Sequence, residues 1–127
     1  MKEKILIVDD DSHLITLLQF NLEDEGYLVK SAKDGKQALN IMKKDKIDLI
    51  ITDMMMPGMD GLELCRRVKN EPLWKSCPVI MLTARVQLSD KEKGKEAGVD
   101  DYIAKPFQIK ELLASVKKNL KLYSNKK

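Results

Sequence analysis

Residues 47–64 read IDLIITDMMMPGMDGLEL. The first part, residues 49–51, is short and wholly apolar, as expected for a strand that is buried on both faces of a sheet. It leads to Asp53, and the pair Pro57-Gly58 then indicates a turn. Asp60 can cap a following helix, because its side chain accepts hydrogen bonds from the first free N–H groups. This stretch therefore predicts one strand–loop–helix unit of an α/β protein.

The rest of the chain repeats this alternation of short apolar runs and helical patterns. Further apolar runs occupy residues 5–8 and 79–82, with weaker ones at 27–29 and 102–104. Apolar residues recur at helical intervals of three and four at Leu14, Leu17, Leu18 and Leu22, and again at Ile109, Leu112, Leu113, Val116 and Leu120. Asp11 or Ser12 is the predicted N-cap of the first helix. Five strands alternating with five helices predict an α/β fold with a doubly wound, five-stranded parallel sheet.

Polar residues follow the apolar runs where a parallel sheet would bring them together. Asp9 and Asp10 follow the first run, Asp53 the third, Thr83 the fourth and Lys105 the fifth. Each residue alone has an ordinary structural explanation, such as a helix cap or a turn. In open α/β sheets, however, ligands bind at the carboxyl ends of the strands, near the point where the strand order reverses. The joint placement of these residues therefore predicts a single site at one rim of the sheet.

The three carboxylates of this rim predict a divalent cation. At about 5 Å each pair would repel by roughly 3 kcal/mol for an effective dielectric constant of about 20, so stability alone does not favour the cluster. Oxygen ligands suit Mg²⁺, whereas zinc sites usually include His or Cys. The only histidine, His13, is expected to be solvated at the start of the first helix. A cation and a lysine beside a carboxylate also suit covalent phosphoryl transfer.

Length and composition predict one cytoplasmic domain. The 127 residues suit a single domain, which we place at residues 1–122 with a short basic tail at 123–127. The net charge of +3 comes from residues 117–127, which carry five lysines and no acidic residue, and the slightly acidic remainder disfavours direct nucleic-acid binding. No apolar run is long enough for a membrane span or a signal peptide. The two cysteines, Cys65 and Cys77, are expected to be reduced.

Four segments together resemble one known family. They are ILIVDDD at residues 5–11, the stretch 47–64, VIMLTAR at 79–85 and GVDDYIAKPF at 98–107, and they are similar in order and spacing to the receiver domains of two-component response regulators. The resemblance covers roughly residues 4–120 and implies the flavodoxin-like strand order 2-1-3-4-5. It also implies Mg²⁺-dependent phosphoryl transfer from the phosphohistidine of a sensor histidine kinase, or from a phosphotransfer protein. Because the acceptor is consumed in this transfer, the chain is expected not to be a turnover enzyme.

The resemblance assigns metal-binding roles to four positions of this sequence. The side chains of Asp10 and Asp53 would coordinate Mg²⁺, and Asp9 would act mainly through water. Met55 would contribute its backbone carbonyl, so its side chain need not suit a metal. All three methionines at the end of this strand, Met54, Met55 and Met56, are expected to be partly exposed.

The same resemblance assigns the phosphoryl chemistry. Asp53 would be the phosphoacceptor, and Lys105 would pair with it before transfer and with a phosphoryl oxygen afterwards. The Thr83 Oγ and the Ala84 N–H would bind the other oxygens, and the small side chain of Ala84 would leave them room. The family commonly has a cis peptide bond before the proline at position 106.

Thr83 and Tyr102 would act as a switch. Phosphorylation would draw Thr83 toward the new charge, and the space that it vacates would let Tyr102 turn inward. The surface formed by residues 88–98, 101–104 and 108–120 would change as a result. This surface would then bind a downstream effector or output domain, or a second copy of the chain. Several of its residues are similar to receivers that dimerise through cross-subunit ion pairs: Asp90, Lys91, Gly94, Asp100, Asp101 and Glu111. Ser115, however, stands where those receivers usually carry a basic residue.

Two other functions remain open from the sequence. A Mg²⁺-dependent phosphohydrolase with an aspartate nucleophile usually has a second carboxylate two positions later, where this chain has Met55. A flavodoxin-like cofactor binder would need a phosphate-binding loop rich in Ser, Thr and Gly after the first strand. Here residues 9–11 are all aspartate, which would repel a flavin phosphate.

Overall fold

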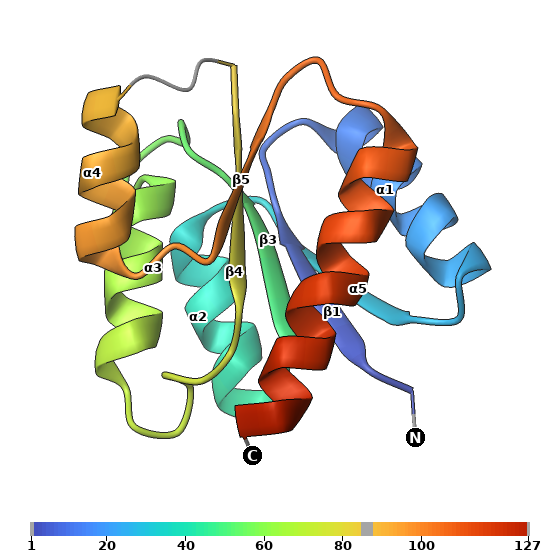
Figure 1. Ribbon diagram of the computed structural model, residues 1–127, viewed down its shortest axis with the longest axis horizontal. Helices are drawn as coiled ribbons and strands as arrows, with labels where there is room; N and C mark the ends of the chain where they lie inside the picture. Colours follow the sequence, from blue (N-terminus) through green and yellow to red (C-terminus); the bar gives the residue numbers. More distant parts are fainter. Residues whose placement is uncertain (1, 85–87, 127) are drawn as a thin grey trace.

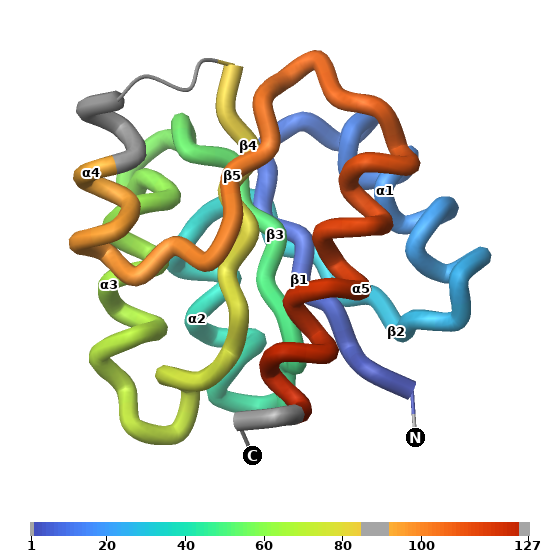
Figure 2. Tube along the Cα trace, in the orientation of Figure 1, coloured from blue at the N-terminus to red at the C-terminus, as the bar shows by residue number. Residues whose placement is uncertain are grey.

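The computed structural model describes residues 2–84 and 88–126 and shows the predicted alternation of strands and helices (Figures 1 and 2). The strands are β1 (Lys4–Val8), β2 (Leu28–Ala32), β3 (Leu49–Asp53), β4 (Val79–Thr83) and β5 (Asp101–Ala104). The helices are α1 (Ser12–Asp24), α2 (Gly35–Lys44), α3 (Gly61–Asn70), α4 (Leu88–Ala97) and α5 (Ile109–Lys126).

The five strands form one parallel sheet in the order β2-β1-β3-β4-β5, which confirms the predicted fold class and topology. Helices α1 and α5 cover one face, and α2, α3 and α4 cover the other (Figure 1). Alternate residues of β1 show the consequence for the core. Ile5 and Ile7 pack with α1 and α5, whereas Leu6 and Val8 pack with the helices opposite. Residues 49–51 of β3 and 79–82 of β4 are apolar and buried because both faces of these central strands are covered.

Aspartate side chains fix the starts of three helices. Asp11, one of the two predicted caps of α1, accepts hydrogen bonds from the backbone N–H groups of His13 at 3.0 Å and Leu14 at 3.4 Å. Asp34 caps α2, and Asp60 caps α3 as predicted. Each cap satisfies N–H groups that have no partner within the helix.

Both cysteines are buried in the core. Cys65 and Cys77 are free thiols, and burial raises the pKa of each to about 12, so both are protonated and unreactive at neutral pH. The side chain of His13 is solvated, as predicted. The peptide bond between Lys105 and Pro106 is cis. Among the described helices, none combines the length and the apolar character that crossing a membrane requires.

The expected exposure of the three consecutive methionines was wrong for two of them. Met55 is 76% exposed, but Met54 and Met56 are buried, at 8% and 9%. The chain turns back over the sheet after β3, so that the Met56 sulfur lies 3.9 Å from the Thr52 hydroxyl, which donates a weak hydrogen bond to it. At the other end of the chain, α5 continues to Lys126, past the predicted domain boundary at residue 122.

Candidate functional site

The strand order determines where the site lies. The chain passes from β1 to β2 on one side and then returns to β3 on the other, so the direction of winding reverses between β1 and β3. The helices that follow these two strands lie on opposite faces of the sheet, and in open α/β sheets ligands bind at the carboxyl ends of the strands beside such a reversal; we call this part of the rim the crevice. Asp9 follows β1 directly, and Asp53 is the last residue of β3. The fold thus brings together acidic residues that lie far apart in the sequence.

Three carboxylates meet in this crevice. Asp9, Asp10 and Asp53 each place one carboxylate oxygen within 4.8 Å of the others. Asp9 is almost completely buried, Asp53 is half-buried and Asp10 is exposed. Among the residues that the structure describes, this is the one group of three or more such side chains close enough to share a metal ion.

The environment of Asp9 disfavours its ionised form. Burial away from water raises the pKa of the Asp9 carboxyl above its ordinary value of 3.8, and the nearby charge of Asp53 raises it further. A hydrogen bond of 2.9 Å from the Asp11 backbone N–H and the positive charge of Lys105 act in the opposite direction. The net rise in pKa means that burial and the charge of Asp53 together outweigh the stabilisation that Asp11 and Lys105 give to the ionised carboxyl.

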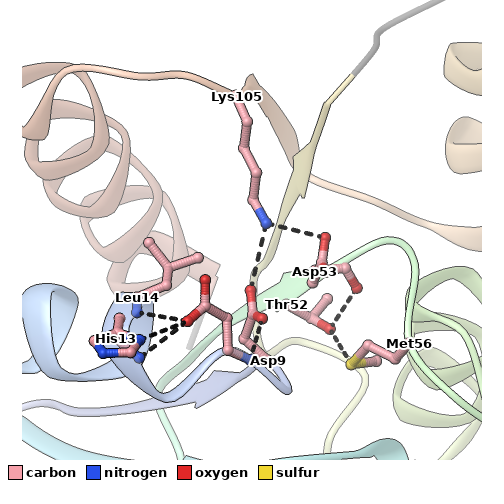
Figure 3. Close-up of polar contacts among 8 residues, drawn as sticks. Asp9, His13, Leu14, Thr52, Asp53, Met56 and Lys105 are labelled. Atoms are coloured by element: carbon pink, nitrogen blue, oxygen red, sulfur yellow. Dashed lines mark hydrogen bonds and ion pairs between the residues drawn. The ribbon is translucent and has the colours of Figure 1, made fainter.

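Lys105 reaches into the crevice from the loop after β5 (Figure 3). Its Nζ lies 3.3 Å from Oδ1 of Asp53 and 3.5 Å from Oδ2 of Asp9. The expected ion pair with Asp53 is therefore present, and it extends to Asp9, which the sequence did not indicate. A single ammonium group links the ends of β1, β3 and β5.

Thr83 and Ala84 complete the rim at the end of β4. The Thr83 side chain is buried at 4% exposure, and its hydroxyl donates a weak hydrogen bond to the Met54 sulfur at 3.8 Å. Ala84 is exposed, and Thr83 lies beside Ala104 in the register of β4 and β5. The register therefore places Thr83 next to the residue that precedes Lys105.

Gly61 holds the loop between β3 and α3 against the sheet, a role that the sequence pattern did not indicate. Its N–H donates a hydrogen bond of 2.9 Å to the Met54 carbonyl. A Cβ at this position would overlap with the Asp53 carbonyl oxygen and would lie 2.7 Å from the Met81 sulfur. Only glycine allows this approach, so Gly61 positions both Asp53 and the segment that carries Met55. The available signal was the Asp60-Gly61 pair, which indicated only a helix start.

The donor set of the crevice fits Mg²⁺. All three candidate ligands offer hard carboxylate oxygens, and neither His nor Cys belongs to the group. Mg²⁺ prefers one or two carboxylates with several waters, and it favours substrate phosphate oxygens. The exposed carboxylate of Asp10 leaves one side of the cluster open to water and to a ligand.

Tyr102 of β5 lies against α4, where Gly94 leaves room for its ring. A Cβ on Gly94 would overlap with the hydroxyl oxygen and with Cζ of Tyr102. Tyr102 is half-buried and packs on the core beneath α2, α3 and α4. The two expected switch residues, Thr83 and Tyr102, thus stand on neighbouring strands, with Tyr102 turned to α4.

Two of the four acidic residues that are similar to those of dimerising receivers, Asp100 and Asp101, have partners within the chain. Asp100 accepts a hydrogen bond of 2.8 Å from the Nζ of Lys69, and Asp101 accepts a short one from the Ser115 hydroxyl. The buried Ser115 thus contacts Asp101 at the position where a basic residue was expected. Asp90 and Lys91 have side chains outside the described part of the structure.

Comparisons with known proteins identify the family of this fold. The family model described as "Response regulator receiver domain" matches residues 5–117. The chain is 46% identical over 117 residues to the alkaline phosphatase synthesis transcriptional regulatory protein PhoP of Bacillus subtilis (strain 168), which covers 92% of this chain and 48% of PhoP. The chain therefore spans about half the length of this curated relative.

Solved structures show the same similarity in three dimensions. A CheY-like response regulator receiver domain protein from Methanospirillum hungatei JF-1 has a TM-score of 0.93 and 30% identity, with both chains fully covered. Chemotaxis protein CheY4 of Vibrio cholerae has a TM-score of 0.90 and 34% identity over 93% of this chain and 98% of its own. The chain thus belongs to the receiver domain family of two-component response regulators, whose members bind Mg²⁺ at an acidic pocket and interact with histidine kinases and effectors.

Proposed function

We propose that Asp53 accepts a phosphoryl group from the phosphohistidine of a sensor histidine kinase or a phosphotransfer protein. The observation that carries this proposal is the joint approach of Lys105 and two further carboxylates to Asp53 at the open rim of the sheet. Bound Mg²⁺ would be held by Asp10, Asp53 and the Met55 carbonyl, with Asp9 acting through water, and would neutralise and orient the phosphoryl oxygens.

The transfer exchanges one bond to phosphorus for another. A carboxylate oxygen of Asp53 attacks the phosphorus atom in line, and the bond between phosphorus and the imidazole nitrogen breaks. The electron pair of that bond stays on the imidazole, which then takes up a proton. Lys105 moves from the carboxylate to a phosphoryl oxygen, while the Thr83 hydroxyl and the Ala84 N–H donate to the other two. Because Asp53 is itself the acceptor, each chain reacts once until the acyl phosphate is hydrolysed.

The new charge on Asp53 would change the surface formed by α4, β5 and α5. Thr83 would move toward the phosphoryl group, and Tyr102 would leave its place over Gly94 and turn inward. The altered surface would bind an effector, an output domain or a second copy of the chain. A homodimer of the expected kind would require Asp100 and Asp101 to exchange their present partners, Lys69 and Ser115.

The proposal also covers the domain bounds, the cellular location and the contacts of this receiver. We place the receiver at residues 1–122, followed by the basic segment 123–127, in the cytoplasm, with no membrane contact and no direct contact with nucleic acid. A phosphohydrolase function is disfavoured, because the position two residues after Asp53 is the apolar, 76% exposed Met55, which cannot transfer a proton.

Incubation with acetyl phosphate and Mg²⁺, followed by mass spectrometric mapping, tests the acceptor. We expect one phosphoryl group on Asp53, and none when Mg²⁺ is chelated. The matched control is Asp48→Asn, which removes a carboxylate outside the crevice and should leave labelling unchanged. Normal labelling of an Asp53→Asn variant by acetyl phosphate or by a histidine kinase would overturn the proposal. Sustained turnover of phosphate esters would instead indicate a phosphohydrolase.

A further inference from the structure

Positive charge is concentrated around α2, away from the site at the sheet rim. Residues 33–46 carry five lysines and two aspartates, although the chain up to residue 116 has more acidic than basic residues. Both aspartates are already engaged. Asp34 accepts a hydrogen bond of 2.8 Å from the Gln37 N–H, and Asp45 lies 3.1 Å from the Nζ of Lys4. The helix itself contains three lysines and no acidic residue.

A groove runs along the same helix. A hollow of about 600 Å³ lies between α2 and the loop before α3, with Leu39 and Met59 in its lining. A second, of about 420 Å³, shares Leu39 and reaches Trp74. A third, of about 300 Å³, shares Trp74 and reaches Tyr123 near the end of α5. The shared residues make these three hollows one continuous surface, which we call the α2 groove.

The floor of the α2 groove is apolar and its rim is mainly cationic. Five basic side chains line it (Lys36, Lys43, Lys44, Lys46 and Arg67) against three acidic ones (Asp34, Asp45 and Glu71). Leu39, Met59 and Trp74 are half-buried side chains that pack on the core cluster below. Lys36 and Lys43 are exposed along α2, and the part of the structure described here shows no ion pair for either. A ligand that fits this surface needs apolar groups for the floor and carboxylates for the rim.

We propose that the α2 groove docks an acidic amphipathic segment of a partner protein. Its apolar side chains would lie on Leu39, Met59 and Trp74, and its Asp and Glu residues would pair with Lys36 and Lys43. Amphipathic segments bind grooves of this kind through apolar anchors on one face. The charge complementarity selects an acidic partner and predicts affinity that falls with increasing salt.

The α2 groove lies outside the surface that the phosphoryl switch would change, because its one residue of α5, Tyr123, follows the last residue of that surface, 120. Figure 1 shows α2 next to α3, whereas α5 lies across the sheet from both. The proposal therefore does not depend on whether Asp53 accepts a phosphoryl group. The α2 groove does include Met59, which lies in the same loop as Met55. A docked partner and a bound metal ion would therefore contact the same segment of the chain.

Trp74 is the only tryptophan of the chain, so its fluorescence reports on the groove alone. The probe is a synthetic peptide of about 16 residues, roughly 24 Å long as a helix, with Leu and Phe on one face and Glu on the other. We expect saturable binding with a blue shift of the Trp74 emission. A scrambled peptide of the same composition should bind about tenfold more weakly, a difference of about 1.4 kcal/mol.

Paired charge reversals locate the binding surface. Lys36→Glu combined with Lys43→Glu should weaken binding of the probe at least about tenfold, measured by fluorescence titration at low salt. The matched control is Lys110→Glu with Lys117→Glu on α5, which makes the same charge change at exposed positions across the sheet and should have less than about a twofold effect. A second variant, Leu73→Ser, removes an exposed apolar side chain from the end of the groove near Tyr123. This change should also weaken binding of the probe.

Three results would overturn the proposal. The first is binding of the probe without any change in the Trp74 emission. The second is an equal loss of affinity in the α2 and α5 reversals, which would indicate a nonspecific charge effect. The third is stronger binding of a DNA duplex than of the peptide, with the same dependence on Lys36 and Lys43, which would assign the groove to nucleic acid.

Discussion

The hydroxyl of Tyr102 occupies the space where a side chain on Gly94 would begin. This contact brings the ring of a β5 residue directly onto the backbone of α4, so the two elements can approach only with glycine at position 94. Gly94→Ala should therefore destabilise the protein by about 1–3 kcal/mol through overpacking. The loss of stability should exceed the stabilisation of about 1 kcal/mol that replacing glycine by alanine usually gives in a helix interior. Urea denaturation measures the difference.

The double-mutant cycle with Tyr102→Ala isolates this contact. Once the ring is absent, Gly94→Ala should stabilise the protein by up to about 1 kcal/mol through helix propensity alone. A cost of Gly94→Ala that persists without the ring would contradict this assignment.

Gly61→Ala should disturb the metal site more than the fold. The added methyl group would displace the Asp53 carbonyl and the loop that carries Met55, so we expect Mg²⁺ affinity to fall at least about tenfold, since metal sites tolerate little misplacement of their ligands. Isothermal titration with Mg²⁺ provides the measurement. Gly26→Ala is the control, because Gly26 has a φ of 96° with nothing nearby. It should lower stability by about 1–2 kcal/mol through backbone strain and leave Mg²⁺ binding unchanged.

Asp9→Asn should stabilise the metal-free protein by about 1 kcal/mol near neutral pH, because it removes a buried carboxylate that Asp53 repels. The folded-state pKa of Asp9 is raised, so the native protein binds this proton more tightly than the unfolded chain does. Stability of the wild type should therefore fall as pH rises from the unfolded value of about 3.8 through the folded pKa, and the variant should lack this component. Thermal unfolding across this range checks both effects.

Asp34→Asn serves as the control for that comparison, since Asn also caps helices and Asp34 lies outside the cluster. Added Mg²⁺ should raise the melting temperature of the wild type and of Asp34→Asn, and raise that of Asp9→Asn less. Equal stabilisation of all three proteins by Mg²⁺ would show that Asp9 takes no part in metal binding.

Lys105→Met should have the opposite effect on the metal-free protein. It leaves Asp9 and Asp53 without their shared ammonium partner, and we expect a loss of about 1–2 kcal/mol. Labelling by acetyl phosphate should also slow, whereas Mg²⁺ affinity should not decrease, because a competing positive charge is gone. Lys110→Met, an exposed change on α5, should alter neither quantity. Unchanged labelling of Lys105→Met would show that the ammonium group has no part in the transfer.

Buried strands were easier to predict from the sequence than exposed ones. Strands β3 and β4 are central and covered on both faces, so their runs are wholly apolar and their positions were predictable. Strand β2 is an edge strand with mostly exposed or half-buried residues, and the weak run at 27–29 marked only its beginning. The buried Met54 and Met56 were missed because their cover comes from the fold of the following loop, which a local pattern does not contain.

The sequence by itself determined that acidic residues follow the first and third strands and that a lysine follows the fifth, and a parallel sheet must bring such residues to one rim. Only the tertiary structure decided which atoms meet there. Lys105 bridges Asp53 and Asp9, which lies 96 positions earlier in the chain, and Ser115 contacts Asp101 instead of leaving it free for a second subunit. The reason is physical: strand periodicity sets which residues reach an edge, whereas the distances between their side chains depend on packing among elements far apart in the chain.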